Sequence, residues 1–253
     1  MSKIYHGTYA YKTDLGRVRQ KNEDQAMVLM NSSGETFLVV CDGMGGAKKG
    51  ELASKLAIDI LTDSFRHKSK HIFSYGNRLW ITKAAKEANA KINRYAEKNG
   101  KIKGMGTTMV AALLYGSKLM IANIGDSRCY LLDHDKGTIR QMTEDQTYVR
   151  YLVSTGKITE EDALSHPDRH VLMNALGIYP SVSLSVDVLP YKGESILLCT
   201  DGLYNSVSEE QIANILLTDD RCDQKVSSLV AEANHNGGSD NIGIALWESI
   251  AND

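Results

Sequence analysis

The chain has 253 residues, of which 42% are hydrophobic, and its formal net charge is −2. This length and apolar content are enough for one large core, so we expect a single domain over residues 1–253. Because there is no excess of basic residues, the composition argues against a nucleic-acid or anionic-membrane partner.

Targeting signals and disulfides are not expected either. The longest apolar run, at residues 109–115, is far too short to cross a bilayer, and the N-terminal residues lack a signal-peptide pattern. The cysteines lie far apart without C-x-x-C spacing, at Cys41, Cys129, Cys199 and Cys222. We therefore expect buried free thiols and a cytoplasmic location.

The first half of the chain predicts strands followed by two long helices. Short β-rich apolar runs predict strands at residues 5–11, 25–30 and 36–41. The period then changes, and Leu52, Leu56 and Ile60 recur at the spacing of a helix over residues 50–65. A second helix is expected at about residues 77–98, with Gly100 as its C-terminal stop.

The second half is again mostly strands, with helices near its end. Strands are predicted at residues 107–115, 118–124, 128–132, near Ile139, and at 183–189, 194–200 and 242–247. Helices are predicted at residues 209–217, where Ser208 and Gln211 have capping-box spacing, and at 223–236. Since strands come in runs and helices in pairs, the fold class is α+β, with a mostly antiparallel β-sandwich covered by helices.

Residues 143–177 form a polar insertion that we expect to be a surface flap. It contains a predicted short helix at residues 148–154 and a capping-box pattern at Thr159 to Asp162. His166 and His170 could be metal ligands or acid–base groups. We interpret them as residues of a solvated flap with an ordinary His-Pro turn.

Aspartates repeatedly follow apolar strands. The predicted strands that end at Cys41, Ile124 and Thr200 are each followed, at once or after one glycine, by Asp42, Asp126 and Asp201. Further aspartates occur at Asp14, Asp24 and Asp240. One Asp-Gly pair is more simply a turn, but a repeated pattern predicts that the strand ends converge. Carboxylates that converge repel one another, and hard cations such as Mg²⁺, Mn²⁺ or Ca²⁺ relieve that repulsion.

Six motifs, in order and spacing, resemble those of the metal-dependent protein serine/threonine phosphatases of the 2C type, most closely the bacterial branch. They are Arg19-Gln20-Lys21-Asn22-Glu23-Asp24, Asp42-Gly43-Met44-Gly45-Gly46, Gly106-Thr107-Thr108, Gly125-Asp126-Ser127-Arg128, Thr200-Asp201-Gly202 and Gly238-Ser239-Asp240-Asn241. The resemblance covers essentially the whole chain as one phosphatase catalytic domain. It implies a central antiparallel β-sandwich flanked by helices on both faces, a four-layer αββα arrangement.

The resemblance also implies a metal centre with two ions, Mn²⁺ or Mg²⁺, and a weaker third. Asp42 is similar to the carboxylate that bridges both ions. The Gly43 carbonyl resembles a further ligand to one of them, and Asp201 and Asp240 match the residues that complete the protein ligands of the first ion. Glu23, with Asp24, matches the acidic pair that holds the second ion directly or through waters. Asp126, together with Asp201, resembles the third site.

Arg19 matches the residue that binds the substrate phosphate, and its guanidinium presents paired donors to phosphate oxygens. A pair of divalent ions can activate a water for direct attack on phosphorus, so no phosphoenzyme is required. Animal members of the family carry a histidine at the place of Met44 that is thought to protonate the leaving group. Methionine cannot do so, and we expect a metal-bound water in that role.

The resemblance implies a hydrolase that acts on phosphoserine and phosphothreonine in proteins and takes part in bacterial signalling. Its expected partners are phosphorylated proteins, either Ser/Thr kinases or their substrates, and we expect a monomer. Two alternatives remain. One is a phosphoprotein- or kinase-binding pseudophosphatase. The other is a Mg²⁺-dependent phosphatase of the haloacid-dehalogenase type, whose Asp-x-Asp motif is found neither at Asp42 nor at Asp201.

Overall fold

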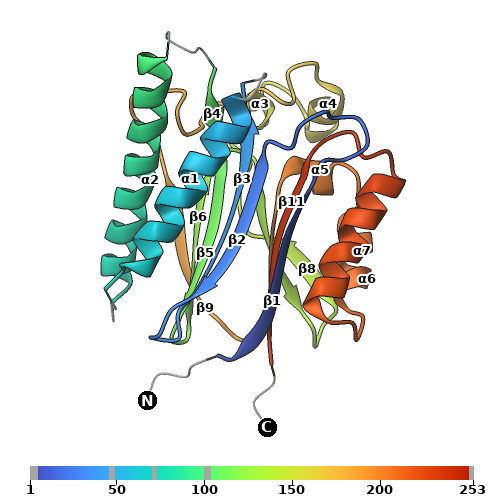
Figure 1. Ribbon diagram of the computed structural model, residues 1–253. Coiled ribbons are helices and arrows are strands. Elements are labelled where there is room, and N and C mark those ends of the chain that lie inside the picture. The colour runs from blue at the N-terminus through green and yellow to red at the C-terminus, as the bar shows by residue number, and fades with distance from the viewer. Residues whose placement is uncertain (1–4, 46–48, 70–72, 100–103, 251–253) are drawn as a thin grey trace.

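Two antiparallel sheets pack face to face in a computed structural model that describes residues 5–45, 49–69, 73–99 and 104–250 (Figure 1). Gly46 and Gly100, which the sequence assigned to a motif and to a helix end, lie outside these described residues. One sheet has the strand order β1 (Gly7–Asp14), β11 (Ile242–Ser249), β10 (Ser195–Cys199), β7 (Arg128–Asp133) and β8 (Thr138–Gln141).

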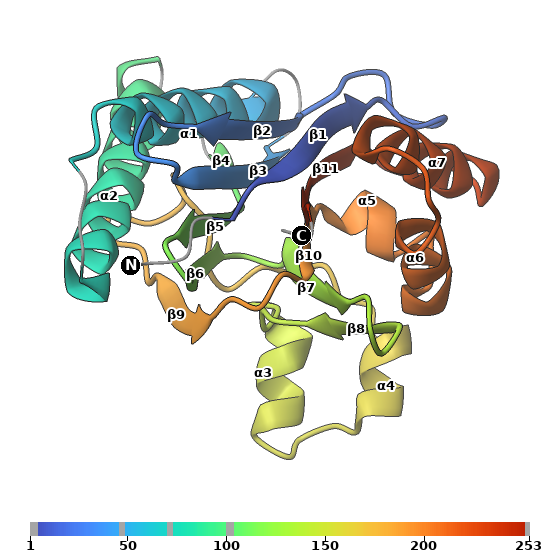
Figure 2. The same cartoon turned by 90° about the horizontal axis from the view of Figure 1, so that it is seen from below.

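The other sheet has the order β2 (Asp24–Met30), β3 (Thr36–Met44), β5 (Met109–Tyr115), β6 (Lys118–Ile124) and β9 (Ser185–Pro190). The short strand β4 (Gly106–Thr107) pairs with the end of β3. Helices cover both outer faces, as the view from below shows (Figure 2). Helices α1 (Lys49–Arg66) and α2 (Ser74–Lys98) lie on the second sheet, and α5 (Asp201–Tyr204), α6 (Glu209–Leu216) and α7 (Cys222–His235) on the first. The predicted α+β sandwich is therefore confirmed.

Both faces of the central strands are buried, which explains their unbroken apolar sequences. In β3, Phe37 and Val39 pack toward α1 and α2, whereas Leu38 and Val40 pack between the sheets. Because successive side chains of a strand point to opposite faces, such a run contributes to two hydrophobic layers at once. The layer between the sheets includes Trp247 of β11, which is fully buried.

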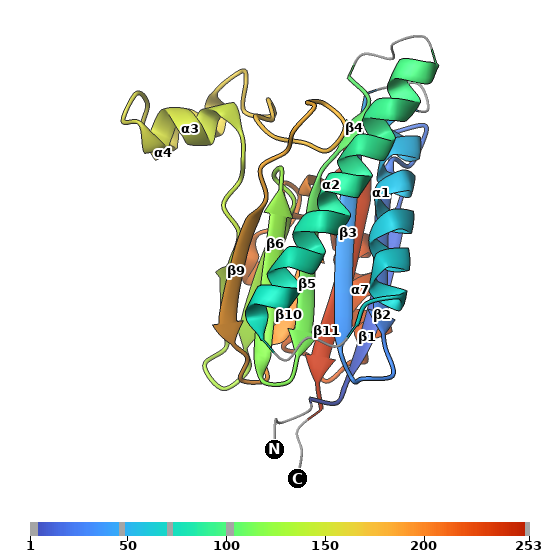
Figure 3. The same ribbon diagram turned by 90° about the vertical axis from the view of Figure 1, so that its left-hand side faces the viewer.

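The predicted flap lies beside the sandwich at one end and carries helices α3 (Tyr148–Ser154) and α4 (Glu160–Ser165) (Figure 3). Its predicted capping box forms, since the Thr159 hydroxyl accepts the Asp162 N–H and Asp162 accepts the Thr159 N–H. Two isolated bridges, from Thr107 to Leu176 and from Thr147 to Leu172, attach the flap to the strands and close it on itself.

Three sequence predictions differ from the structure near the strand ends. Strand β3 does not stop at Cys41 but continues to Met44, because Gly43 pairs with Thr107 of β4. The strand predicted at residues 107–115 is interrupted at Thr108. Helix α5 was not predicted, and Asp201 is its first residue rather than part of a turn. The other elements begin and end within a few residues of their predicted bounds.

All four cysteines are buried free thiols, as predicted. No helix in the described ranges is long and apolar enough to span a membrane.

Candidate metal centre

Four aspartates from separate segments line one cavity of about 410 Å³. Asp42 belongs to β3, Asp126 lies in the turn between β6 and β7, Asp201 begins α5, and Asp240 precedes β11. Neighbouring antiparallel strands run in opposite directions, so in the first sheet the end of β10 lies beside the starts of β7 and β11. The end of β3 in the second sheet lies at the same end of the sandwich, because Asp42 lines the same cavity. Of the eight residues assigned to the site from sequence, the cavity wall includes all but Asp24, adding Arg19, Glu23 and Gly43 to the four aspartates.

Asp24 lies behind the cavity wall and joins the two sheets. Its side chain is 1% exposed, and its Oδ2 accepts a hydrogen bond of 2.8 Å from the Thr200 hydroxyl. That hydroxyl oxygen also accepts the Gly243 N–H at 2.8 Å. Asp24 is not part of the cavity lining, and its contact with the second ion, directly or through waters, stays a prediction.

Burial and mutual repulsion raise the pKa of the cavity carboxyls. Burial, followed by the charges of Asp24 and Asp201, holds the pKa of Asp42 well above its ordinary value. Burial and then the charge of Asp201 raise the pKa of Asp126 to about 7. Burial and then the charge of Asp240 raise the pKa of Asp201 to about 6. The fold therefore confines negative charge that a bound cation would neutralise.

The donors suit hard divalent cations. Glu23, Asp42, Asp201 and Asp240 offer carboxylate oxygens, which Mg²⁺ and Mn²⁺ prefer, and no cysteine lines the cavity among the described residues. Across the described ranges, no three Asp, Glu, His or Cys side chains already have the arrangement of a finished metal site. Asp240 Oδ2 accepts a hydrogen bond of 2.7 Å from the Arg19 guanidinium. The residues of the cavity thus have the donor chemistry that hard cations need, although their side chains are not arranged as a complete coordination shell.

The main chain at Asp42 is held tightly by neighbouring hydroxyls. Its N–H donates to the Thr108 hydroxyl at 2.9 Å, and its carbonyl accepts the Thr107 hydroxyl at 2.8 Å. The Thr108 and Ser127 hydroxyls are 2.7 Å apart, which links this strand to the β6–β7 turn. A Cβ at Gly43 would collide with the Gly50 carbonyl oxygen. Only glycine therefore lets α1 start this close to the cavity.

The opposite wall of the cavity comes from the flap and the segment after it. Its lining residues are His170, Leu172, Ala175, Ile178 and Tyr179. Asn89 of α2 holds this segment, because its Oδ1 accepts the Gly177 N–H at 2.7 Å and its Nδ2 donates to the Tyr179 carbonyl at 3.0 Å. The wall is thus anchored to the helical layer.

The two flap histidines have different surroundings. His166 caps a turn by accepting the Asp168 N–H at 3.1 Å, which agrees with the ordinary His-Pro turn inferred from sequence. His170 is exposed but lines the cavity, so it is not only a solvated flap residue. Met44 lines the same cavity.

Arg128, the last residue of the Gly-Asp-Ser-Arg motif, supports the site from outside the cavity. Its guanidinium donates to Asp145 at 2.7 Å and lies 3.6 Å from the centre of the Tyr204 ring. The Tyr204 hydroxyl in turn donates to the carbonyl of Asp126 at 3.1 Å. A cation and an aromatic ring therefore fix the turn that carries Asp126.

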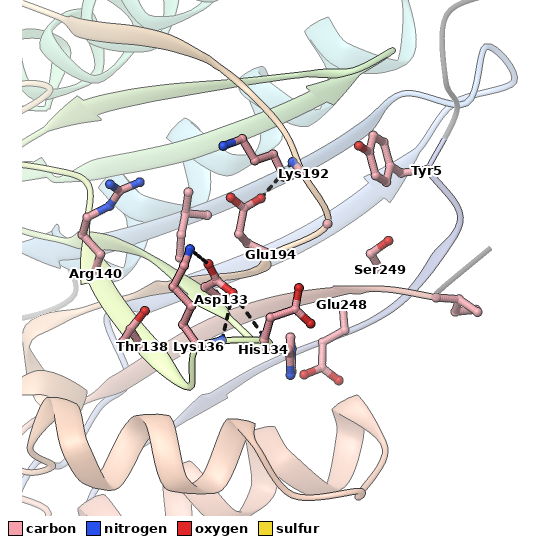
Figure 4. A pocket seen from close by; sticks show the side chains of 14 residues that line it. Tyr5, Asp133, His134, Lys136, Thr138, Arg140, Lys192, Glu194, Glu248 and Ser249 are labelled. Carbon is pink, nitrogen blue, oxygen red and sulfur yellow. Dashed lines mark hydrogen bonds and ion pairs between the residues drawn. The ribbon is translucent and has the colours of Figure 1, made fainter. Parts of the chain in front are cut away.

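A wider cavity of about 840 Å³ lies at the other end of the sandwich, at the last residues of β7 and β11 (Figure 4). Several of its acidic side chains already have partners. Asp133 lies 2.6 Å from Lys136, Glu194 accepts the backbone N–H of Lys192 at 2.9 Å, and Glu248 lies 2.8 Å from Lys225 of α7. The carboxyls whose pKa values are raised by burial line the smaller cavity instead.

Comparisons with known proteins agree on one family. The model of the family described as Protein phosphatase 2C matches residues 16–236 of this chain. The serine/threonine phosphatase stp of Listeria welshimeri is 39% identical over 239 residues, which are 94% of each chain. The crystal structure of the serine/threonine phosphatase Stp1 from Staphylococcus aureus has a TM-score of 0.90 at 34% identity and covers 100% of this chain and 98% of its own.

A structure of the catalytic domain of the serine/threonine protein phosphatase PstP in complex with two manganese ions is also similar. It has a TM-score of 0.81 at 32% identity, with 97% of this chain and 99% of that chain covered.

The raised pKa values predict how the metal-free protein responds to pH. Asp126 and Asp201 bind protons more tightly when folded than when unfolded, where an aspartate titrates near pH 4. Their contribution to stability is complete below about pH 4 and is lost as the pH rises through about 6 to 7. With a chelator present, Tm should therefore fall between about pH 5 and 8, and less steeply in Asp126→Asn. A Tm that does not fall over this range would show that folding does not raise the pKa values of these carboxyls.

Proposed function

Because the chain belongs to the protein phosphatase 2C family, it is a protein serine/threonine phosphatase, and we propose that it hydrolyses its substrate in the carboxylate cavity. The observation that carries this proposal is the convergence of Asp42, Asp201 and Asp240 in one cavity with Arg19. Membership of this family does not favour a haloacid-dehalogenase mechanism. A pseudophosphatase is not favoured, because every residue expected to bind a metal is present.

The groups at the cavity would divide the work of holding cations. Asp42 would hold two divalent cations, the first together with Asp201 and Asp240, and the second together with Glu23, directly or through waters with Asp24. The Gly43 carbonyl would be a further ligand to one of them, and Asp126 with Asp201 would hold a weaker third. Mn²⁺ or Mg²⁺, once bound, would neutralise the carboxylates and lower the pKa of a bound water. The manganese ions in the related PstP structure support this proposal.

Arg19 would bind the phosphoryl group. Its side chain is 52% exposed at the cavity mouth, and its guanidinium is already within hydrogen-bonding distance of Asp240. A planar guanidinium can donate two parallel hydrogen bonds to phosphate oxygens, which orients the phosphorus toward the carboxylate-lined floor. Charge development on those oxygens during transfer makes such a contact stronger in the transition state than in the substrate complex.

The natural substrates would be phosphoserine and phosphothreonine in proteins, with Ser/Thr kinases or their targets as partners. The flap supplies part of the cavity wall, through His170, Leu172 and Ala175, and would select among phosphoproteins. We further infer that the enzyme is a monomer and works in the cytoplasm. The four buried free thiols support a reducing compartment.

The metal requirement can be tested with Asp201→Asn. Removing one carboxylate from the proposed first ion should lower kcat/KM for p-nitrophenyl phosphate on the order of 100-fold in saturating Mn²⁺. The wild type should be inactive in chelator. Asp133→Asn, at the far end of the sandwich, is the matched control and should retain wild-type activity. Turnover without metal, or full activity in Asp201→Asn, would contradict the proposed mechanism.

The source of the leaving-group proton can be tested at His170. Since Met44 has no proton to give, we infer that solvent supplies it, although His170 is the imidazole in the described cavity wall. A serine alkoxide needs protonation more than nitrophenolate does, so a general acid reveals itself as a selective loss on phosphoserine. His170→Gln should keep kcat on a phosphoserine peptide within about threefold. A loss confined to the peptide substrate would make His170 the acid.

A further inference from the structure

Asn241 connects the predicted metal ligand Asp240 to the segment that carries Arg19 and Glu23. Residues 15–23 link β1 to β2 and contain no helix or strand. Asn241 is 6% exposed and lies directly after Asp240. Its side chain makes three hydrogen bonds, all to the main chain of this segment. An irregular segment of this length gains a fixed shape only where such contacts offset its conformational entropy.

The three hydrogen bonds use both N–H donors of the amide and its carbonyl oxygen. Asn241 Nδ2 donates to the Leu15 carbonyl at 2.9 Å and to the Lys21 carbonyl at 2.9 Å. Asn241 Oδ1 accepts the Glu23 N–H at 2.8 Å. Because carbonyls only accept and an N–H only donates, these partners define the orientation of the amide. Aspartate could not donate to either carbonyl, and leucine could form none of the bonds.

Backbone contacts on both sides hold Asn241 itself in place. A Cβ at Gly202 would collide with the Asn241 carbonyl oxygen, so its main chain packs against the start of α5, beside Asp201. A Cβ at Gly16 would likewise collide with the Asp240 carbonyl oxygen. The segment and the strand are therefore in direct contact, and Arg17 N–H donates to the Gly238 carbonyl at 2.7 Å.

We propose that Asn241 is a positioning residue that sets Arg19 and Glu23 in register with Asp240. It fixes the segment at Leu15, before Arg19, and at Lys21 and Glu23, after it. Asn241 therefore holds both ends of the segment from which Arg19 reaches Asp240. This inference rests on the proposed function, since Arg19 must bind phosphate for its position to matter.

The test compares Asn241→Ala with Arg19→Ala and with the double variant. Inorganic phosphate, a competitive product, probes Arg19 directly. Asn241→Ala should weaken inhibition by phosphate roughly tenfold and raise KM for p-nitrophenyl phosphate by a similar factor. In phosphate inhibition the double variant should be no worse than Arg19→Ala, because Asn241 acts on phosphate binding through Arg19, and that contact is already lost. Asn241→Gln, which keeps the amide but lengthens the side chain, should give a smaller loss if the alanine variant does not fold.

Hydrogen exchange provides a readout that does not depend on bound metal. In chelator, residues 15–23 of Asn241→Ala should exchange faster than in the wild type, while the sandwich strands stay protected. The matched control is Asn31→Ala. Asn31 also makes three hydrogen bonds, to Ser33 and Glu35, but in the β2–β3 hairpin at the end remote from the cavity. Asn31→Ala should lower Tm without changing inhibition by phosphate.

The outcomes separate this inference from the proposed function. If Asn241→Ala behaves like Asn31→Ala, with a lower Tm and unchanged phosphate inhibition, Asn241 is merely structural and the inference is wrong. Additive losses in the double variant would also overturn it. If Arg19→Ala itself leaves phosphate inhibition unchanged, the assignment of Arg19, and with it the proposed function of the cavity, is wrong instead.

Discussion

The repulsion among buried carboxylates is the constraint on which the rest of this structure depends. Asp42, Asp126 and Asp201 line one small cavity with raised pKa values, and Arg19 at its mouth is paired with Asp240. Like charges in a partly desolvated space destabilise the fold unless protons or cations neutralise them. The carboxylate cluster therefore lowers the stability of the metal-free fold, and divalent cations bound in the cavity would restore it.

The sandwich can hold this charge because its strand ends are joined to one another at several points. Asp24 of the second sheet accepts a hydrogen bond from Thr200, which follows β10 of the first sheet. Hydroxyls of Thr107 and Thr108 fix the main chain of Asp42. Three apolar layers, one between the sheets and one beneath the helices on each outer face, pack the strands behind these contacts. The hydroxyl contacts and the packed core thus hold the carboxylates close together despite their mutual repulsion.

Much of this arrangement could be predicted from sequence, because it follows from local patterns. Alternation along β3 and helical spacing along α1 come directly from burial on one or two faces. The capping boxes at Thr159 and Ser208 are also local, and both form. Helix α5 escaped prediction because a helix of four residues has too few turns to show a period. The inward position of Asp24 depends on Thr200, which is remote in sequence, and the pairing of β4 with β3 likewise depends on distant residues. The cavity positions of His170 and Tyr179 follow from how the flap folds back, which no local pattern encodes.

Anomalous diffraction from crystals soaked in Mn²⁺ tests the central claim most directly, because it locates the ions rather than inferring them from activity. We expect two strong manganese peaks inside the cavity, with oxygens of Asp42 in contact with both and Asp201 and Asp240 in contact with one. Manganese found only outside the cavity, or a cavity without bound manganese at saturating concentration, would contradict the account.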